Sequence, residues 1–255
     1  MSPPTHFGLE YEINPLMHVD IPIQKEKAQR EWERLRTIVA KNAIISTIDP
    51  ANKPDFVFTA NAGLVRDKEI ILSSFKFPER QPEEPYWRSW FQNQGYTTHE
   101  LHGVSFEGAG DALFVDKHTL VGGYGFRSDK RAYDSIEAIW PDIHTIRVEL
   151  IDNRFYHLDT CLCPLDEQTI LYFPDAFSVA SQNELQKTFR CIPVSQHDAL
   201  RFVCNAVVCG QTIIVPHGAY DTMQKLTRHG FTIYEVDMTE FLKSGGAAKC
   251  LTLSI

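Results

Sequence analysis

The chain repeats one short pattern four times, and this repeat restricts the possible folds more than any other feature. Each copy begins with a small polar residue, continues through an apolar run, turns through charged, polar or glycine residues, and returns as a second apolar run. This order predicts a β-hairpin. The copies begin at 61, 111, 160 and 205, so the steps are 50, 49 and 45 residues, a period typical of repeat arrays and propellers.

A further step of 45 residues reaches Cys250, which precedes an apolar run at 251–253 with no return strand after it. Residues 7–13 have a suitable pattern to pair with that run and close a ring. Between the hairpins, helical patterns cover 25–41, 86–94, 131–139, 178–189 and 222–229. Gly95 is a candidate helix C-cap, and 181–184 resembles a capping box.

These units predict an α/β protein of a particular kind, a five-bladed α/β propeller with pseudo-fivefold ββαβ repeats and one central site. No glycine-rich or serine-rich linker and no block of charge interrupts the chain, so we expect a single domain, 1–255. The alternative is an ordinary α/β domain in which the repeats are similar by chance.

Composition excludes several classes of function. Apolar residues make up 43% of the chain, which is enough for a packed core, and 33 acidic against 25 basic residues give a net charge of −8. This balance disfavours nucleic acid or an anionic membrane as a partner and suits a cationic or small neutral ligand. The first residues lack a secretion signal, and no apolar run is long enough to span a bilayer.

The six cysteines form neither a secreted disulfide framework nor a zinc-binding spacing, so we expect a reduced, cytoplasmic protein with no metal. His99 and His102 have no further ligand pair to complete a zinc site. The sequence gives no sign of an organic cofactor either.

Three local motifs carry candidate chemistry. In 106–111, small residues leave Glu107 and Asp111 on either side of a turn between apolar runs, where solvated acids are unusual. In 155–160, His157 and Asp159 would share one face of a strand, and a carboxylate beside a histidine suits acid–base work. In 243–251, a glycine-rich loop leads into Cys250, a candidate nucleophile. Each motif alone has a structural explanation: a solvated turn, a hydrogen-bonded histidine or an inert buried cysteine.

Together the motifs resemble the guanidine-modifying enzymes of the pentein, or amidinotransferase, superfamily. Those enzymes share a glutamate in an EGxG-type turn, a histidine in an HxD segment and a cysteine near the C-terminus, which Glu107, His157 with Asp159, and Cys250 match in order. The sequences at 14–17, 58–63 and 244–253 are most similar to the arginine dihydrolase branch. Some members of that branch carry a C-terminal domain related to ornithine cyclodeaminase. We expect this chain to lack it, because it ends five residues after Cys250.

The resemblance implies a mechanism. Cys250 as a thiolate would attack the guanidinium carbon of arginine, and His157 would protonate the leaving ammonia and then activate water. Glu107 would orient the substrate or share the proton transfer, and Asp159 would hold guanidinium nitrogens. The positive charge of the substrate would itself lower the thiol pKa. The only partner expected is this small-molecule substrate, and a homo-oligomer stays open.

The resemblance also assigns residues to substrate binding. Arg80 and Arg127 match arginines that hold the substrate carboxylate, for which a planar guanidinium fork is well suited. Their alternative role is an exposed surface charge. Asn14 matches a substrate contact of the dihydrolase branch.

Asn61 bears on which reaction is expected. In the deiminases and the dimethylarginine enzymes the matching position is typically acidic, which favours the charged guanidinium. An amide can also donate to the carbonyl oxygen of citrulline, so Asn61 favours a second round of hydrolysis that gives ornithine, ammonia and carbon dioxide. The alternatives are a deiminase-like or dimethylargininase-like hydrolase that stops at citrulline, an amidinotransferase, and a binding protein of the same fold.

Overall fold

The computed structural model describes residues 1–255 and contains four three-stranded sheets of the same topology. In each sheet an antiparallel hairpin is followed by a third strand that runs parallel to the middle one. The strands are β1 (Gly63–Arg66), β2 (Glu69–Leu72), β3 (Thr97–His99), β4 (Ala112–Phe114), β5 (Thr119–Tyr124), β6 (His144–Glu149), β7 (Leu162–Pro164), β8 (Thr169–Tyr172), β9 (Arg190–Pro193), β10 (Val207–Cys209), β11 (Thr212–Pro216) and β12 (Thr232–Val236). All four predicted hairpins are therefore confirmed.

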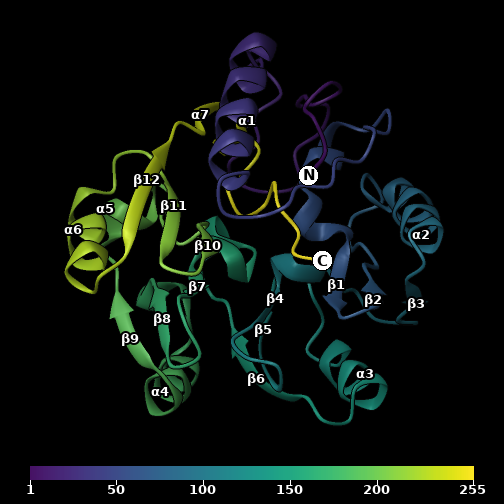
Figure 1. Cartoon of the computed structure of the whole chain (residues 1–255). Coiled ribbons are helices and arrows are strands. Elements are labelled where there is room, and N and C mark those ends of the chain that lie inside the picture. The colour runs from purple at the N-terminus through teal and green to yellow at the C-terminus, as the bar shows by residue number, and fades with distance from the viewer.

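The four sheets surround a common centre in chain order, and the longest helix occupies the remaining sector (Figure 1). The innermost strands are β1, β4, β7 and β10, and the C-terminus lies among them. The helices are α1 (Lys25–Val39), α2 (Glu84–Asn93), α3 (Ala132–Ile139), α4 (Val179–Thr188), α5 (Gln196–Ala199), α6 (Tyr220–Arg228) and α7 (Thr239–Leu242).

All five predicted helices form, as α1, α2, α3, α4 and α6, with ends within two residues of the predicted ones. The predicted capping box is wrong by one turn. Ser178 is the N-cap of α4 and accepts from Ser181 N at 3.4 Å, whereas Ser181 Oγ accepts from Glu149 N at 2.8 Å. Ser181 therefore ties α4 to β6.

The two chain ends do not pair as predicted. Residues 7–13 and 251–253 form no strand, so the fifth hairpin is absent. Phe7 instead packs between Phe241, stacked at 4.9 Å, and Phe58, edge-on at 5.6 Å. Ala60 N donates to Cys250 O at 3.0 Å and joins the last segment to the turn that precedes the first sheet. Aromatic packing thus replaces a ladder of strand hydrogen bonds at this junction.

Short 3₁₀ helices precede three of the inner strands and turn the chain at the centre. They are η2 (Thr59–Ala62), η4 (Gly108–Gly110) and η6 (Leu158–Thr160). Four others lie elsewhere: η1 (Pro54–Val57), η3 (Gln81–Glu83), η5 (Asn153–Phe155) and η7 (Pro174–Ala176). The predicted strand over 155–160 is therefore wrong, because η5 and η6 occupy most of that stretch.

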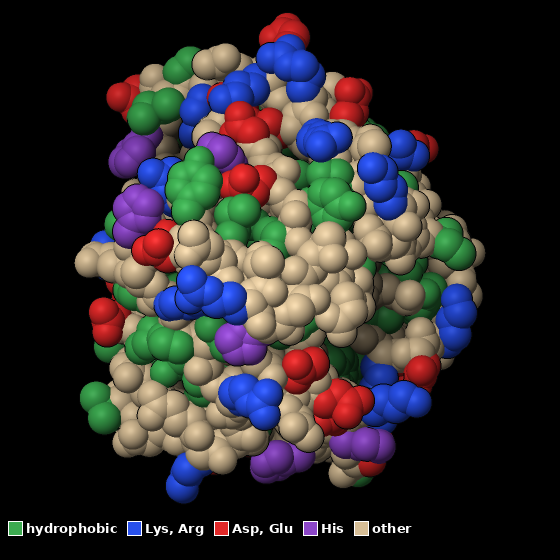
Figure 2. Space-filling model, turned by 60° about the vertical axis from the view of Figure 1, so that its left-hand side comes forward, with side chains coloured by type: hydrophobic (Ala, Val, Ile, Leu, Met, Phe, Trp, Pro, Cys, Tyr) green, Lys and Arg blue, Asp and Glu red, His purple; other side chains and the backbone are tan.

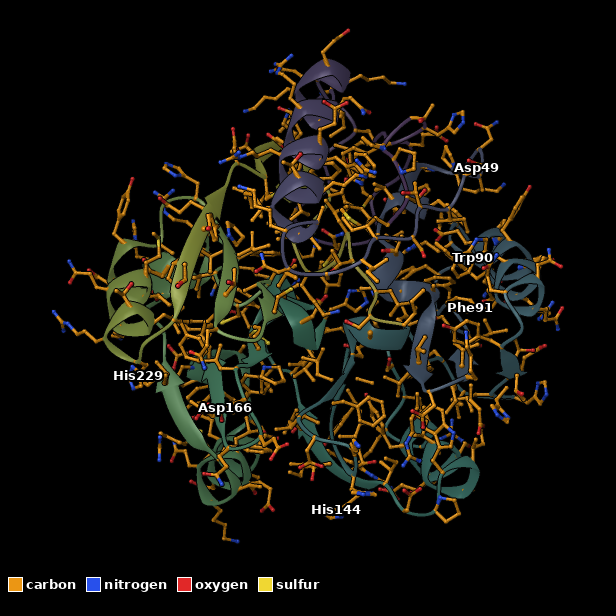
Figure 3. The ribbon with its side chains drawn as sticks, in the orientation of Figure 1. Asp49, Trp90, Phe91, His144, Asp166 and His229 are labelled. Carbon is orange, nitrogen blue, oxygen red and sulfur yellow. The ribbon has the colours of Figure 1, made fainter.

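The hydrophobic core surrounds the centre and extends outward under the helices. The largest cluster joins α1 to the third and fourth sheets, and smaller clusters lie beneath α2 and α3. Trp90 and Phe91 lie on α2 at one edge of the ring, whereas His144 and His229 lie on its outer rim (Figure 3). On the face drawn in Figure 2, basic and acidic side chains are interspersed. No helix combines the length and apolarity that crossing a bilayer requires.

Tyr133 of α3 ties its helix to the second sheet. Its hydroxyl donates to Gly123 O at 2.6 Å and approaches Asp111 O at 2.9 Å, and the side chain is fully buried. Tyr133→Phe should therefore lower the free energy of unfolding by about 1–3 kcal/mol, since it removes the hydroxyl that donates to the buried Gly123 carbonyl, whereas Asp111 O keeps Gly123 N at 2.7 Å. Urea denaturation measures this change. Tyr86→Phe on the exposed side of α2 is the control, and equal stability of the two variants would contradict the assignment.

Candidate active site

Side chains from widely separated parts of the chain line one small cavity at the centre. Its volume is about 10 Å³, room for roughly one water molecule. A guanidine-sized ligand must therefore displace part of the wall. The lining residues are Ile13, Asn14, Asp55, Phe58, Asn61, Arg80, Arg127, Tyr156, His157, Ser244, Gly245, Gly246 and Cys250. Six of the eight predicted site residues are among them, and the other two, Glu107 and Asp159, bond directly to lining side chains.

Glu107 forms the centre of a buried charge network. The turn that begins η4 positions its carboxylate, which contacts His157 Nε2 at 2.7 Å and Arg127 Nη1 at 2.9 Å. Burial would raise the pKa of Glu107, but Arg127 and His157 outweigh it and hold that pKa well below its usual range. Because an ionised carboxylate only accepts, His157 carries a hydrogen on Nε2. His157 Nδ1 has no partner in the protein, which leaves it as the atom that can exchange a proton.

Cys250 lies in a different set of contacts. Its Sγ is 3.2 Å from Asp159 Oδ2 and 3.1 Å from Asn205 Nδ2, and the side chain is almost completely buried. Burial and the nearby Asp159 carboxylate raise the pKa of the Cys250 thiol well above its usual value. The resting residue is therefore a neutral thiol that donates to Asp159.

One of the two carboxylate oxygens of Asp159 is free to bind a ligand. Its Oδ1 is buried without a hydrogen-bond partner, and burial raises the pKa of the carboxyl to about 6 although Lys249 opposes that shift. His157 and Asp159 do not share a face, as the predicted strand required. His157 bonds to Glu107, whereas Asp159 bonds to Cys250. The η6 turn separates them.

Asn61 is held in one orientation by two neighbours. Its Oδ1 accepts from Arg80 Nη1 at 2.9 Å, and its Nδ2 donates to Glu107 O at 3.0 Å. Since Arg80 can only donate, the amide oxygen must face it. The second hydrogen of Nδ2 has no partner, so this side chain can offer a ligand a donor.

The two arginines differ in what they can still bind. Both are buried, which contradicts the alternative of surface charges. Four of the five N–H groups of Arg80 are taken by Glu83, Asn61 and the Asp55 carbonyl. In this arrangement Arg80 cannot hold a carboxylate with two donors.

Arg127 uses only two N–H groups, one on Glu107 and one on Ile13 O at 3.1 Å. Its guanidinium lies between the rings of Phe77, at 4.7 Å, and Tyr156, at 4.5 Å. These rings fix its plane while three N–H groups stay unbonded. Arg127 is therefore the better carboxylate-binding fork.

The segment around Asn14 covers the cavity. Asn14 Nδ2 donates to Ser244 O at 3.1 Å, and Tyr11 donates to Asp55 Oδ2 at 3.0 Å. Asp55 is buried with Oδ1 unpaired, and burial raises its pKa to about 6. An unpaired carboxylate oxygen in a cavity wall suits an ammonium group.

Sequence reasoning missed Asp55 and Asn205. Asn205 begins the fourth repeat, as Asn61 begins the first, so its position was a usable signal. Its amide bonds to Cys250 Sγ, and its Oδ1 accepts from Ala247 N at 3.1 Å and Cys250 N at 3.2 Å. Asp55 had no such signal, because it precedes the first hairpin and becomes a wall residue only through the η1 turn.

Asn205 holds the thiol and its loop, so changing it should change the acidity of Cys250. Asn205→Asp replaces an N–H donor with a carboxylate, which should move the alkylation of Cys250 by iodoacetamide to higher pH. Peptide mass spectrometry across a pH series measures this rate, and the partly exposed Cys209 is an internal control. An unchanged profile at Cys250 would mean that Asn205 only supports the loop.

Comparison with known proteins gives consistent matches over the whole chain. A sequence model of the family described as N,N dimethylarginine dimethylhydrolase, eukaryotic, matches residues 4–255. The bifunctional arginine dihydrolase/ornithine cyclodeaminase ArgZ of Synechocystis is 44% identical over 100% of this chain and 37% of that protein. The N(G),N(G)-dimethylarginine dimethylaminohydrolase of Mycobacterium tuberculosis is 40% identical over 100% of this chain and 84% of that protein.

The solved structures agree. The N-terminal domain of ArgZ, bound to its substrate, superimposes with a TM-score of 0.95 and 43% identity, covering 99% of this chain and 96% of that one. This chain thus corresponds to little more than a third of full-length ArgZ, since it covers 37% of that protein.

Proposed function

The chain belongs to the N,N-dimethylarginine dimethylhydrolase family, and on that premise we propose that it hydrolyses L-arginine to L-ornithine, ammonia and carbon dioxide. Citrulline is the intermediate between two rounds of the same chemistry. The observation that carries the proposal is that Cys250, His157 and the donating amide of Asn61 line one cavity. The likeness to ArgZ, a named arginine dihydrolase, supports it.

In the first round the Cys250 sulfur attacks the guanidinium carbon. The cationic substrate, close to Asp159, offsets the two effects that keep the thiol neutral, burial and the carboxylate charge. The thiol proton passes through His157 to the leaving ammonia, and a thiouronium adduct remains on Cys250. Water activated by His157 then adds to the same carbon and releases citrulline with the free thiol.

In the second round Cys250 attacks the ureido carbon of citrulline and expels a second ammonia. Water cleaves the resulting thiocarbamate, and the carbamate of ornithine loses carbon dioxide. The ureido group is neutral and presents an oxygen where the guanidinium presented N–H groups. The free N–H of Asn61 can donate to that oxygen.

Charged groups at the wall hold the amino-acid end of the substrate. Arg127, stacked between two rings, binds the carboxylate, and Asp55 accepts from the ammonium group. Arg80 contributes its one free N–H and positions Asn61. Asn14 closes over the ligand, and Asp159 holds a guanidinium nitrogen through Oδ1.

A second candidate is hydrolysis of methylated arginine with citrulline as the end product. The 40% identical relative from Mycobacterium tuberculosis, a named dimethylarginine hydrolase, favours it. The same cysteine chemistry serves both reactions. They differ in whether citrulline leaves or is retained.

We also propose that the four sheets and the α1 sector are the five units of a propeller within a single domain, 1–255. In the fifth unit α1 and the chain ends would take the place of a sheet. Met1 N donates to Ser46 O at 3.0 Å, which supports the joining of these segments. All six cysteines are free thiols, in keeping with a cytoplasmic location.

Product analysis tests the proposal directly. Purified protein with arginine should yield ornithine, with citrulline only transient, and Cys250→Ser should release no ammonia. Asn61→Asp removes the donor and should slow the second round by about one to two decades, so that citrulline accumulates.

Asn93→Asp, an exposed change on α2, should leave the product ratio unchanged. Citrulline without ornithine from the unaltered chain would refute the dihydrolase. A preference for dimethylarginine over arginine would favour the second candidate instead.

The pH dependence follows from two buried carboxyls. Asp55 and Asp159 both have pKa values raised to about 6 by burial, and both must be ionised to hold cationic groups. As the pH falls through about 6 they gain protons and lose this charge, so kcat/KM for arginine should fall on the acid side. Asp175→Asn, an exposed change, should leave the acid limb of the kcat/KM profile, its fall at low pH, unchanged. A flat profile down to pH 5 would exclude both carboxylates from substrate binding.

A further inference from the structure

A second cavity lies at the centre of the four sheets, and the proposed reaction does not use it. Each inner strand begins beside the active site, and these strands, together with residues just before them, line this second cavity of about 210 Å³. The wall comes from β1, β4, β7 and β10 together with the C-terminal segment. In Figure 1 these four strands surround the C-terminus. We call this second cavity the axial cavity, and it lies on the other side of the Cys250 segment from the active site.

The lining of this axial cavity is almost entirely apolar. Thirteen of the seventeen lining residues are hydrophobic, including Leu113, Leu162, Val207 and Leu253. Lys249 is the only charged one. A ligand that fits these walls must bury an apolar surface and present at most one charged group.

The ammonium group of Lys249 has no carboxylate within ion-pair distance. The only hydrogen bond of that group runs from Nζ to Thr252 O at a long 3.4 Å. An ammonium group beside an apolar wall is poorly solvated, so an anion gains there both a charge-assisted hydrogen bond and an opposite charge. A cationic ligand such as arginine would be repelled.

We propose that the axial cavity binds a small monocarboxylate with an apolar tail. The carboxylate pairs with Lys249, and the tail packs against Leu113, Leu162, Val207 and Leu253. A phosphate or another multiply charged anion would have to be desolvated against these apolar side chains, which disfavours it. The cavity is smaller than the ~300–1,000 Å³ of drug-sized sites, so the ligand is short.

Such a ligand would influence Cys250 and Asp159 of the active site through Lys249. This residue directly precedes Cys250, whose thiol donates to Asp159 Oδ2 at 3.2 Å, and the positive charge of Lys249 partly opposes the effect of burial on the pKa of Asp159. A bound carboxylate would neutralise that charge and favour the protonated form of Asp159. This regulatory part rests on the proposed function, whereas binding itself does not.

Titration calorimetry of the full chain with hexanoate tests the binding. We expect one saturable site per chain, and the loss of one charge-assisted hydrogen bond should weaken hexan-1-ol about tenfold or more. Hexylammonium should not bind. Lys249→Met keeps the apolar length of the side chain and should weaken hexanoate to the level of hexan-1-ol, whereas Lys187→Met on α4 should bind like the unaltered chain.

The site of binding is checked by occupying the active site. In the Cys250→Ser variant, saturating arginine should leave hexanoate binding in place, and displacement would mean that hexanoate binds at Arg127. Equal affinity for hexanoate and hexan-1-ol, or full binding by Lys249→Met, would overturn the proposal. These outcomes need no turnover, so they leave the arginine reaction to its own test.

The regulatory part has a separate readout. Hexanoate should move the acid limb of kcat/KM to higher pH in the unaltered chain and in Lys187→Met. In Lys249→Met that limb should already lie higher and should not respond to hexanoate. Binding without any movement of the limb would overturn the coupling to Asp159.

Discussion

The centre of this protein depends on buried polar side chains that connect one repeat to the next. Asn61 of the first repeat donates to the Glu107 carbonyl, Asp111 of the second accepts from Leu158 N, and Asn205 of the fourth donates to the Asp159 carbonyl. A buried amide or carboxylate must find partners, and here the partners belong to the neighbouring unit. The same bonds that join the units therefore bring the site residues together.

The buried carboxyl groups around this centre have pKa values that are shifted in opposite directions, and the neighbouring charges explain why. Glu107 contacts Arg127 and His157, which keep it ionised. The positive partners of Asp159 and Asp55 are more distant, and both carboxyls have pKa values raised to about 6. Burial is nearly equal for all three, so the neighbouring charge decides. One carboxylate holds the histidine, while the others can respond to a cationic ligand.

Local pattern was enough to predict four hairpins, the helices and the three motifs that carry candidate chemistry. The substrate-binding roles of Arg80, Arg127 and Asn14 came from the family resemblance instead, and Asp55 was missed although it lines the cavity. It failed where tertiary packing overrides pattern. The chain ends look like strands, yet Phe7 packs between two aromatic rings instead of extending a sheet. The His157–Asp159 spacing suggested a shared face, but 3₁₀ turns direct the two side chains to different partners. Arg80 looked like a ligand fork, and only the fold reveals that Glu83 already occupies it.

Asn14 and Ser244 form a hydrogen bond across the cavity although 230 residues separate them in the chain. Contacts this distant in sequence form slowly, because a long loop must close before they contribute any stability. On the ribosome, the early repeats can form their sheets long before the cysteine-bearing loop has emerged. Reactivity at the centre thus requires segments from both sides of this long separation, and its recovery during refolding reports that they have come together.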